Sequence, residues 1–183
     1  MAVLKVARMG HPVLRRVAEA VRDPVDPEIL SLIKDMSETM HDAPGVGLAA
    51  PQILVGRRVI LFRAPADRTD GGEEMPETAL INPEIEPVDE RIGLGWEGCL
   101  SVPGLRGLVP RYKNIVYRGW LPDGTFIERT ATGFSARVIQ HEFDHLDGIL
   151  YIDRMHDLRL LVYEEEMVNF RFEEYVDNDD SEN

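Results

Sequence analysis

One short segment of this sequence has the residue types and the spacing of a metal site. Gln140-His141-Glu142-Phe143-Asp144-His145 contains an HExxH pattern inside a stretch with helical periodicity. Side chains four positions apart lie on one face of a helix, so His141 and His145 can reach one ion. Glu142 is rotated about 100° from His141, which places its carboxylate beside that ion. The pattern predicts a metal-dependent hydrolase in which Glu142 takes a proton from the attacking water.

Two histidines leave this ligand set incomplete, because a catalytic metal usually has three protein ligands and one open position. In HExxHxxGxxH metalloproteases a third histidine would fall where this chain has Tyr151. The other candidate is Cys99, the single cysteine, within Gly95-Trp96-Glu97-Gly98-Cys99-Leu100-Ser101. A thiolate beside a divalent cation loses its proton readily, and the preceding glycine leaves backbone room. Cys99 with the two histidines is therefore a chemically sound set, although the sequence does not show that the three are close.

A third candidate segment is rich in glycine and alanine: Gly45-Val46-Gly47-Leu48-Ala49-Ala50-Pro51-Gln52. Such small residues suit a loop that passes close to a ligand, and a tight structural loop explains them equally well. Gln52 is more specific, because a side-chain amide can donate a hydrogen bond to an oxyanion.

Together these segments resemble the peptide deformylase family, whose three motifs read GxGLAAxQ, EGCLS and HExDH. The chain has them in that order in Gly45–Gln52, Glu97–Ser101 and His141–His145. Its opening segment Gly10–Arg15 is similar to the family's GDPxLR, with His11 in place of the usual Asp. The resemblance implies hydrolysis of the N-formyl group from the N-terminal formylmethionine of newly made polypeptides, with release of formate.

The resemblance also implies roles for individual residues. Cys99, His141 and His145 would hold the metal, Glu142 would be the acid and base, and Gln52 with the backbone N–H of Leu100 would bind the oxyanion. The implied ion is Fe²⁺, which Ni²⁺, Co²⁺ or Zn²⁺ often replaces. The cysteine and histidine donors alone would indicate Zn²⁺.

A second group of residues matches positions that bind substrate in the family. Val46 and Gly47 would pair through their backbone with an extended peptide, as in strand addition. Arg106 would lie near the far end of the substrate, and a surface ion pair is an equally good interpretation of it. Glu97, Phe134 and Val138 would line the methionine pocket, with core packing as the alternative for the last two.

The elements that must position these residues indicate an α+β fold. Asp26-Pro27-Glu28 is typical of a helix start, and apolar residues then recur at helical spacing to about His41. Residues 59–62 and 79–81 favour short strands, and residues 64–76 an exposed loop. Residues 115–120 and 125–130 favour a hairpin around Leu121-Pro122-Asp123-Gly124.

The last helix is predicted over Phe134–Leu146, stopped by Gly148, whereas residues 158–170 suit a helix or a strand. Because strands and helices mix without βαβ alternation, we expect mixed or antiparallel sheets packed around a central HExxH metal-binding helix, with a helix near the N-terminus.

Chain length and charge limit the number of domains and the kinds of partner that the protein can have. The chain has 183 residues and a net charge of −13. We predict one catalytic domain over residues 1–163 and an acidic, frayed tail over residues 164–183. The acidic excess argues against nucleic-acid binding, and the tail against docking on ribosomal RNA. No apolar run is long enough to span a membrane, and the first residues lack a signal peptide's apolar length, so a cytoplasmic protein is expected.

Two other functions fit parts of the sequence. An HExxH metallopeptidase would need a third ligand other than Cys99, and the tyrosine at position 151 argues against its HExxHxxGxxH form. An inactive relative that only binds peptide N-termini would need neither Glu142 nor Gln52, and both are present.

Overall fold

The computed structural model describes residues 3–69 and 71–171. Its larger sheet has the strand order β1 (Gly47–Ala49), β2 (Val59–Ala64), β3 (Met75–Pro87), β6 (Asn114–Trp120), β7 (Phe126–Thr132). The smaller sheet has the order β4 (Ile92–Cys99), β5 (Val102–Tyr112), β8 (Leu161–Tyr163). Within each sheet the neighbouring strands pair antiparallel. The α+β class with antiparallel sheets is therefore confirmed.

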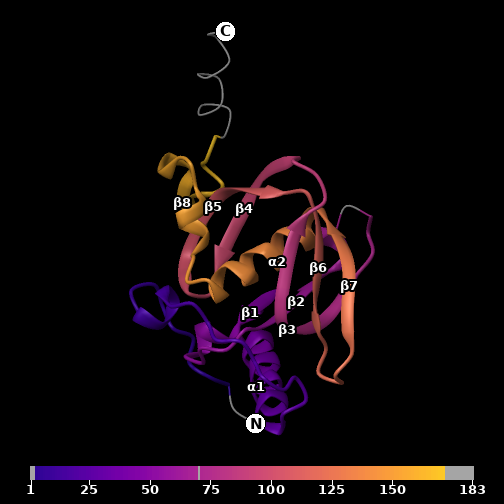
Figure 1. Cartoon of the computed structure of the whole chain (residues 1–183). Coiled ribbons are helices and arrows are strands. Elements are labelled where there is room, and N and C mark those ends of the chain that lie inside the picture. The colour runs from indigo at the N-terminus through magenta and orange to yellow at the C-terminus, as the bar shows by residue number, and fades with distance from the viewer. Residues whose placement is uncertain (1–2, 70, 172–183) are drawn as a thin grey trace.

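Two α-helices accompany the sheets in the described part of the chain: α1 (Pro27–Asp42) and α2 (Gly133–Leu146). Figure 1 shows α2 running between the two sheets, and it contacts β1, β2 and β3 of the larger sheet and β5 of the smaller one. Short 3-10 helices span Pro12–Arg15, Ala50–Ile53, Ala66–Arg68, Tyr151–Arg154, Leu158–Leu160 and Glu164–Glu166. Neither α-helix is long and apolar enough to cross a membrane, as far as the described residues go.

The locally coded elements lie where the sequence places them. Helix α1 begins after Asp26, whose carboxylate accepts a hydrogen bond from the Glu28 N–H at 2.8 Å, and it buries Met36 and Met40. The β6–β7 hairpin turns at Gly124, which has a φ of +82°. After α2, the chain reverses at Gly148 with a φ of +74°, where a side chain would collide with the Arg15 backbone.

Strands β4 and β5 are the main elements that the sequence analysis did not anticipate. Their glycines and prolines weaken any strand signal. In the structure, the room above Gly93 and Gly95 is filled by the side chains of Lys113 and Arg137, which a Cβ at either glycine would meet. The glycines therefore reflect close packing of long side chains over the strand, and not a loop.

Two further predictions needed adjustment. Strand β3 is longer than the predicted segment 79–81, because it continues past a bulge at Asn82, whose φ is +50°. The Asn82 side chain fixes this bend by bonding the N–H and the carbonyl of Val21, both at 2.8 Å. Residues 158–170 form 3-10 turns around β8. Of the predicted acidic tail, residues 172–183 lie outside the described residues, and the boundary at residue 163 stays a prediction.

Candidate active site

The three expected metal ligands come together where β4 ends against α2. Cys99 is the last residue of β4, and His141 and His145 lie one turn apart on α2. One ligand atom from each of the three lies within 4.8 Å of the others, and the Cys99 Sγ is 3.3 Å from the His145 Nε2. Both histidines are buried. The β4–α2 junction thus brings Cys99 beside two histidines that follow it by 42 and 46 positions in the sequence.

This donor set fits a divalent transition-metal ion. One thiolate and two imidazoles leave a fourth position open, as in catalytic sites. Burial holds the pKa of His145 well below its ordinary value, which favours the neutral imidazole that binds a metal. For His141, burial acts the same way, but hydrogen bonds with Cys99 and Glu97 raise the pKa well above its ordinary value. A bound cation would replace that proton.

His141 is oriented by Glu97, whose Oε2 lies 2.8 Å from the His141 Nδ1. Two nitrogens of Arg111 bind the two Glu97 oxygens, at 2.9 and 3.0 Å, and its third nitrogen binds Asp144 at 2.6 Å. Burial alone would raise the pKa of Glu97, but hydrogen bonds from His141 and Arg111 hold it well below its ordinary value. The His141 ring is therefore hydrogen-bonded to an ionised carboxylate, and both oxygens of that carboxylate have partners.

Two further arginines extend this group, which we call the Glu97 network: Glu97, Arg111, Arg137, Asp144 and Arg154. Of these, Arg154 lies at the surface with its side chain 47% exposed. Arg137 donates to Glu97 at 2.9 Å and to the carbonyls of Gly93, Gly95 and Val109. Arg154 donates two hydrogen bonds to Asp144, at 2.7 and 3.1 Å. The network ties α2 to β4 and β5 behind the metal ligands.

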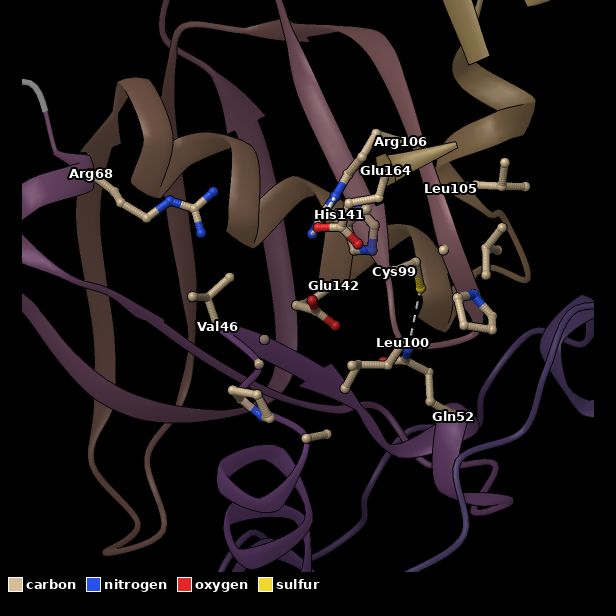
Figure 2. A pocket seen from close by; sticks show the side chains of 18 residues that line it. Val46, Gln52, Arg68, Cys99, Leu100, Leu105, Arg106, His141, Glu142 and Glu164 are labelled. Carbon is tan, nitrogen blue, oxygen red and sulfur yellow. Dashed lines mark hydrogen bonds and ion pairs between the residues drawn. The ribbon is translucent and has the colours of Figure 1, made fainter. Parts of the chain in front are cut away.

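Glu142 points into the cleft beside the ligands and is only 4% exposed (Figure 2). Burial raises its pKa to about 7, and its Oε2 has no hydrogen-bond partner among the described residues. A Cβ on Gly47 would overlap the Glu142 carboxylate, so that glycine lets the backbone of β1 approach it closely. The predicted acid/base and the predicted substrate-binding strand are therefore in contact.

Gln52 lies next to Cys99, below it in Figure 2, where a dashed line joins the two side chains. Its side-chain oxygen accepts from the Ala49 N–H at 2.8 Å, which turns the amide nitrogen toward Cys99 Sγ at 3.4 Å and Ser101 Oγ at 3.1 Å. The amide donor thus faces the candidate metal position. Leu100, whose backbone N–H is the other expected oxyanion donor, lines the same cleft.

A cleft of about 380 Å³ opens in front of these residues, between the start of β1 and the end of β4. It is lined by Val46 and Gly47 on one side and by Gly98 and Leu100 on the other. β1 is an edge strand of its sheet, so it has backbone groups without a strand partner on one side. A smaller cavity of about 70 Å³ adjoins the cleft and is lined by the expected methionine-pocket residues Glu97, Phe134 and Val138.

Around the cleft the structure adds a contact of Arg106 and several residues to which the sequence analysis assigned no role. Arg106 was expected near the substrate, and here it lines the cleft and also pairs with Glu164, from the segment predicted to be the tail. Arg68 lines the cleft too, with its guanidinium 4.2 Å from the centre of the Phe134 ring. The partners Arg111 and Asp144 were also missed. Asp144 lies inside the HExDH motif and could have been noticed there, whereas Arg111 carries no local signal.

Comparison with known proteins identifies the family of the chain. The family model described as polypeptide deformylase matches residues 3–160. The chain is 53% identical to peptide deformylase 1 of Bordetella pertussis over 161 residues, 87% of this chain and 92% of that protein. It is 51% identical to peptide deformylase 1 of Prochlorococcus marinus over 159 residues, 86% of this chain and 83% of that one.

A solved structure is similar over the same region. It is the Met-Ala-Ser-bound class I type b peptide deformylase from Acinetobacter baumannii, with a TM-score of 0.78 and 38% identity. The match covers 84% of this chain and 99% of that one. With the family model spanning the site and relatives more than half identical, the chain belongs to the polypeptide deformylase family.

Proposed function

We propose that this enzyme hydrolyses the N-formyl group of formylmethionyl peptides at the Cys99, His141 and His145 site, with Glu142 as acid and base. The observation that carries the proposal is the placement of the buried Glu142 carboxylate beside Cys99, His141 and His145, next to the edge strand β1. The Oε2 of that carboxylate has no hydrogen-bond partner among the described residues. A divalent ion bound there would supply Lewis-acid activation of the water and of the formyl carbonyl. We expect Fe²⁺ in the cell, with Ni²⁺, Co²⁺ or Zn²⁺ as replacements.

Glu142 is suited to moving a proton at neutral pH. Its pKa of about 7 lets the carboxylate take a proton from the attacking water and return it to the departing amine nitrogen. Gln52 Nε2 and the N–H of Leu100 are placed to donate to the oxygen that gains charge during the attack. Removing one such donor typically lowers the rate by about 10²- to 10³-fold.

The peptide would bind as an added strand along β1. Gly47 and Val46, which directly precedes β1, line the cleft where the peptide backbone would pair, and the methionine side chain would enter the cavity between Phe134 and Val138. Glu97 closes the same cavity while it holds His141. We extend to this chain the peptide binding seen in the Met-Ala-Ser-bound relative.

Residues 1–163 would form the catalytic domain. The enzyme would work in the cytoplasm, and its acidic tail would contact neither nucleic acid nor ribosomal RNA.

The test is formate release from formyl-Met-Ala-Ser by protein prepared anaerobically with Fe²⁺ or reconstituted with Ni²⁺. Glu142→Ala should abolish release and leave the metal content unchanged, because Glu142 is no ligand. The exposed Glu165→Ala variant, which removes the same group elsewhere, should match the unmodified enzyme. Absence of formate from folded, metal-loaded enzyme would refute the proposal, and cleavage of internal bonds in casein would then indicate a metallopeptidase.

A further inference from the structure

We propose that Glu164 sets the charge preference of the substrate cleft by holding Arg106. Glu164 would thereby disfavour peptides with acidic residues downstream of the methionine. This inference rests on the proposed function, since it concerns the peptide bound in that same cleft.

The contact between the two side chains is direct. The Arg106 Nη2 and Nε donate to the Glu164 Oε1 at 2.5 and 3.2 Å. Both residues line the cleft that also contains Cys99 and Glu142, and Figure 2 shows them above His141. The Arg106 side chain is 35% exposed and that of Glu164 56%. A bound peptide can therefore reach both of them, and the pair is not part of the core.

Long-range packing fixes Glu164 at this place. β8 pairs with β5 in a register that sets Val162 opposite Arg106, so the chain leaves β8 beside the cleft. Further along, the Phe170 ring packs edge-on against Trp96, with centroids 5.2 Å apart. The segment from β8 to Phe170 is thus anchored on both sides of Glu164 to the sheet that carries Cys99.

Arg106 is equally constrained. Its guanidinium lies directly over Gly98, where a Cβ would overlap it, one residue from the ligand Cys99. It also lines the smaller cavity next to the cleft. Glu164 is therefore a positioning residue that keeps this cation against the cleft wall, in contact with a carboxylate.

The consequence is a change in the charge that a peptide meets. Apart from His141, the charged side chains that line the cleft in the described chain are Arg68, Arg106, Glu142 and Glu164. Without Glu164, two arginines would attract acidic groups on the peptide. With it, Arg106 is neutralised and a carboxylate faces the peptide as well. Charge complementarity of this kind chiefly changes specificity, and the exposure of the pair keeps the effect modest.

The experiment compares kcat/KM for three amidated peptides: formyl-Met-Ala-Ser, formyl-Met-Ala-Asp and formyl-Met-Ala-Lys. In Glu164→Gln, the ratio of the Asp peptide to the Lys peptide should rise by about two- to fivefold, mainly through KM. Raising the ionic strength to about 1 M should remove the rise, because the Debye length there is only about 3 Å. Glu164→Asp should keep the original ratio, since it preserves the charge.

The matched control is Glu165→Gln, which removes the same charge from the neighbouring exposed residue outside the cleft lining. It should leave the ratio unchanged. The double variant Arg106→Met/Glu164→Gln should lose the preference for Asp that Glu164→Gln gains. An equal change for all three peptides, or the same shift in Glu165→Gln, would overturn the inference.

Failure of the proposed function would be visible separately, as no formate from any of the three peptides in the unmodified enzyme. In that case calorimetric binding of the amidated peptides Met-Ala-Asp and Met-Ala-Lys gives the same comparison. An Asp-to-Lys affinity ratio that Glu164→Gln does not alter would then overturn the inference as well.

Discussion

The polar side chains on two faces of helix α2 differ in whether they have hydrogen-bond partners. On the face toward β4 and β5, Arg137, Gln140 and Asp144 all have partners, and Gln140 alone bonds both the N–H and the carbonyl of Tyr112. On the face toward the cleft, the Oε2 of Glu142 is buried without a partner among the described residues.

The difference separates groups that hold the fold from groups reserved for chemistry. Burying a polar atom without a hydrogen bond costs about 1–3 kcal/mol. One side of α2 avoids that cost, and the other accepts it at Glu142, where the attacking water and a bound peptide would supply the missing contact. The network on the satisfied side then fixes the geometry of the unsatisfied side through the bond from Glu97 to His141.

The largest expected effect on stability is on the face of α2 that packs against β4 and β5. Arg111→Met leaves Glu97 and Asp144 buried without the cation that lies between them, and should lower the free energy of unfolding by about 3–5 kcal/mol. Urea denaturation measures this. Arg118→Met is the control, since Arg118 joins carboxylates that are largely exposed to solvent, and it should cost far less stability than Arg111→Met. Equal losses in the two variants would break the comparison.

Removal of the metal tests the face of α2 that lines the cleft. At a free metal concentration of about 100 times Kd, binding should raise the free energy of unfolding by about 2.7 kcal/mol, and a chelator should remove that gain. Thermal or urea unfolding with and without chelator measures it. His145→Ala should lose most of the difference because it removes a ligand. A variant that keeps the full difference would mean that the ion binds elsewhere.

Glu142→Gln should separate activity from stability on that face. Formate release should fall by about 10²- to 10⁴-fold. The free energy of unfolding of the metal-free protein should stay constant or rise by about 1 kcal/mol, since no charge is then buried. Gln140→Ala on the satisfied face should do the opposite, with a loss of about 1–3 kcal/mol from the two Tyr112 backbone bonds. A clear loss of stability in Glu142→Gln would contradict the interpretation.

The smallest effect is expected just beyond α2, at Asp153. Partial burial would raise the pKa of Asp153, but hydrogen bonds from Arg15 and from the Leu150 N–H lower it. A lowered pKa gives stability that is present above the unfolded-state value, about 3.9, and is lost as the pH falls through the folded-state value. Asp153→Asn should therefore be less stable at pH 7, by well under 1 kcal/mol, and the deficit should shrink below about pH 4. A deficit that grows in acid would exclude this origin.

How much the sequence could predict depended on how local each signal is. The cap at Asp26, the turn at Gly124 and the HExxH spacing act within a few residues, so α1, the β6–β7 hairpin and the catalytic helix were predicted close to their observed bounds. Strands β4 and β5 were not, because their glycines are explained only by side chains from later in the chain. Gly93 and Gly95 of β4 lie against Lys113 and Arg137, and Gly107 of β5 lies against Tyr151 and Met155.

The sequence by itself determined the kinds of atoms available for catalysis and the helix that sets His141 and His145 one turn apart, with Glu142 next to His141. Only the tertiary structure decided that Cys99 meets the two histidines, that Arg111 joins Glu97 to Asp144, and that Glu164 reaches Arg106. The physical reason is that helix and turn geometry follow from neighbouring residues. These contacts depend instead on how β4, β5 and β8 pack against α2, which many weak interactions determine together.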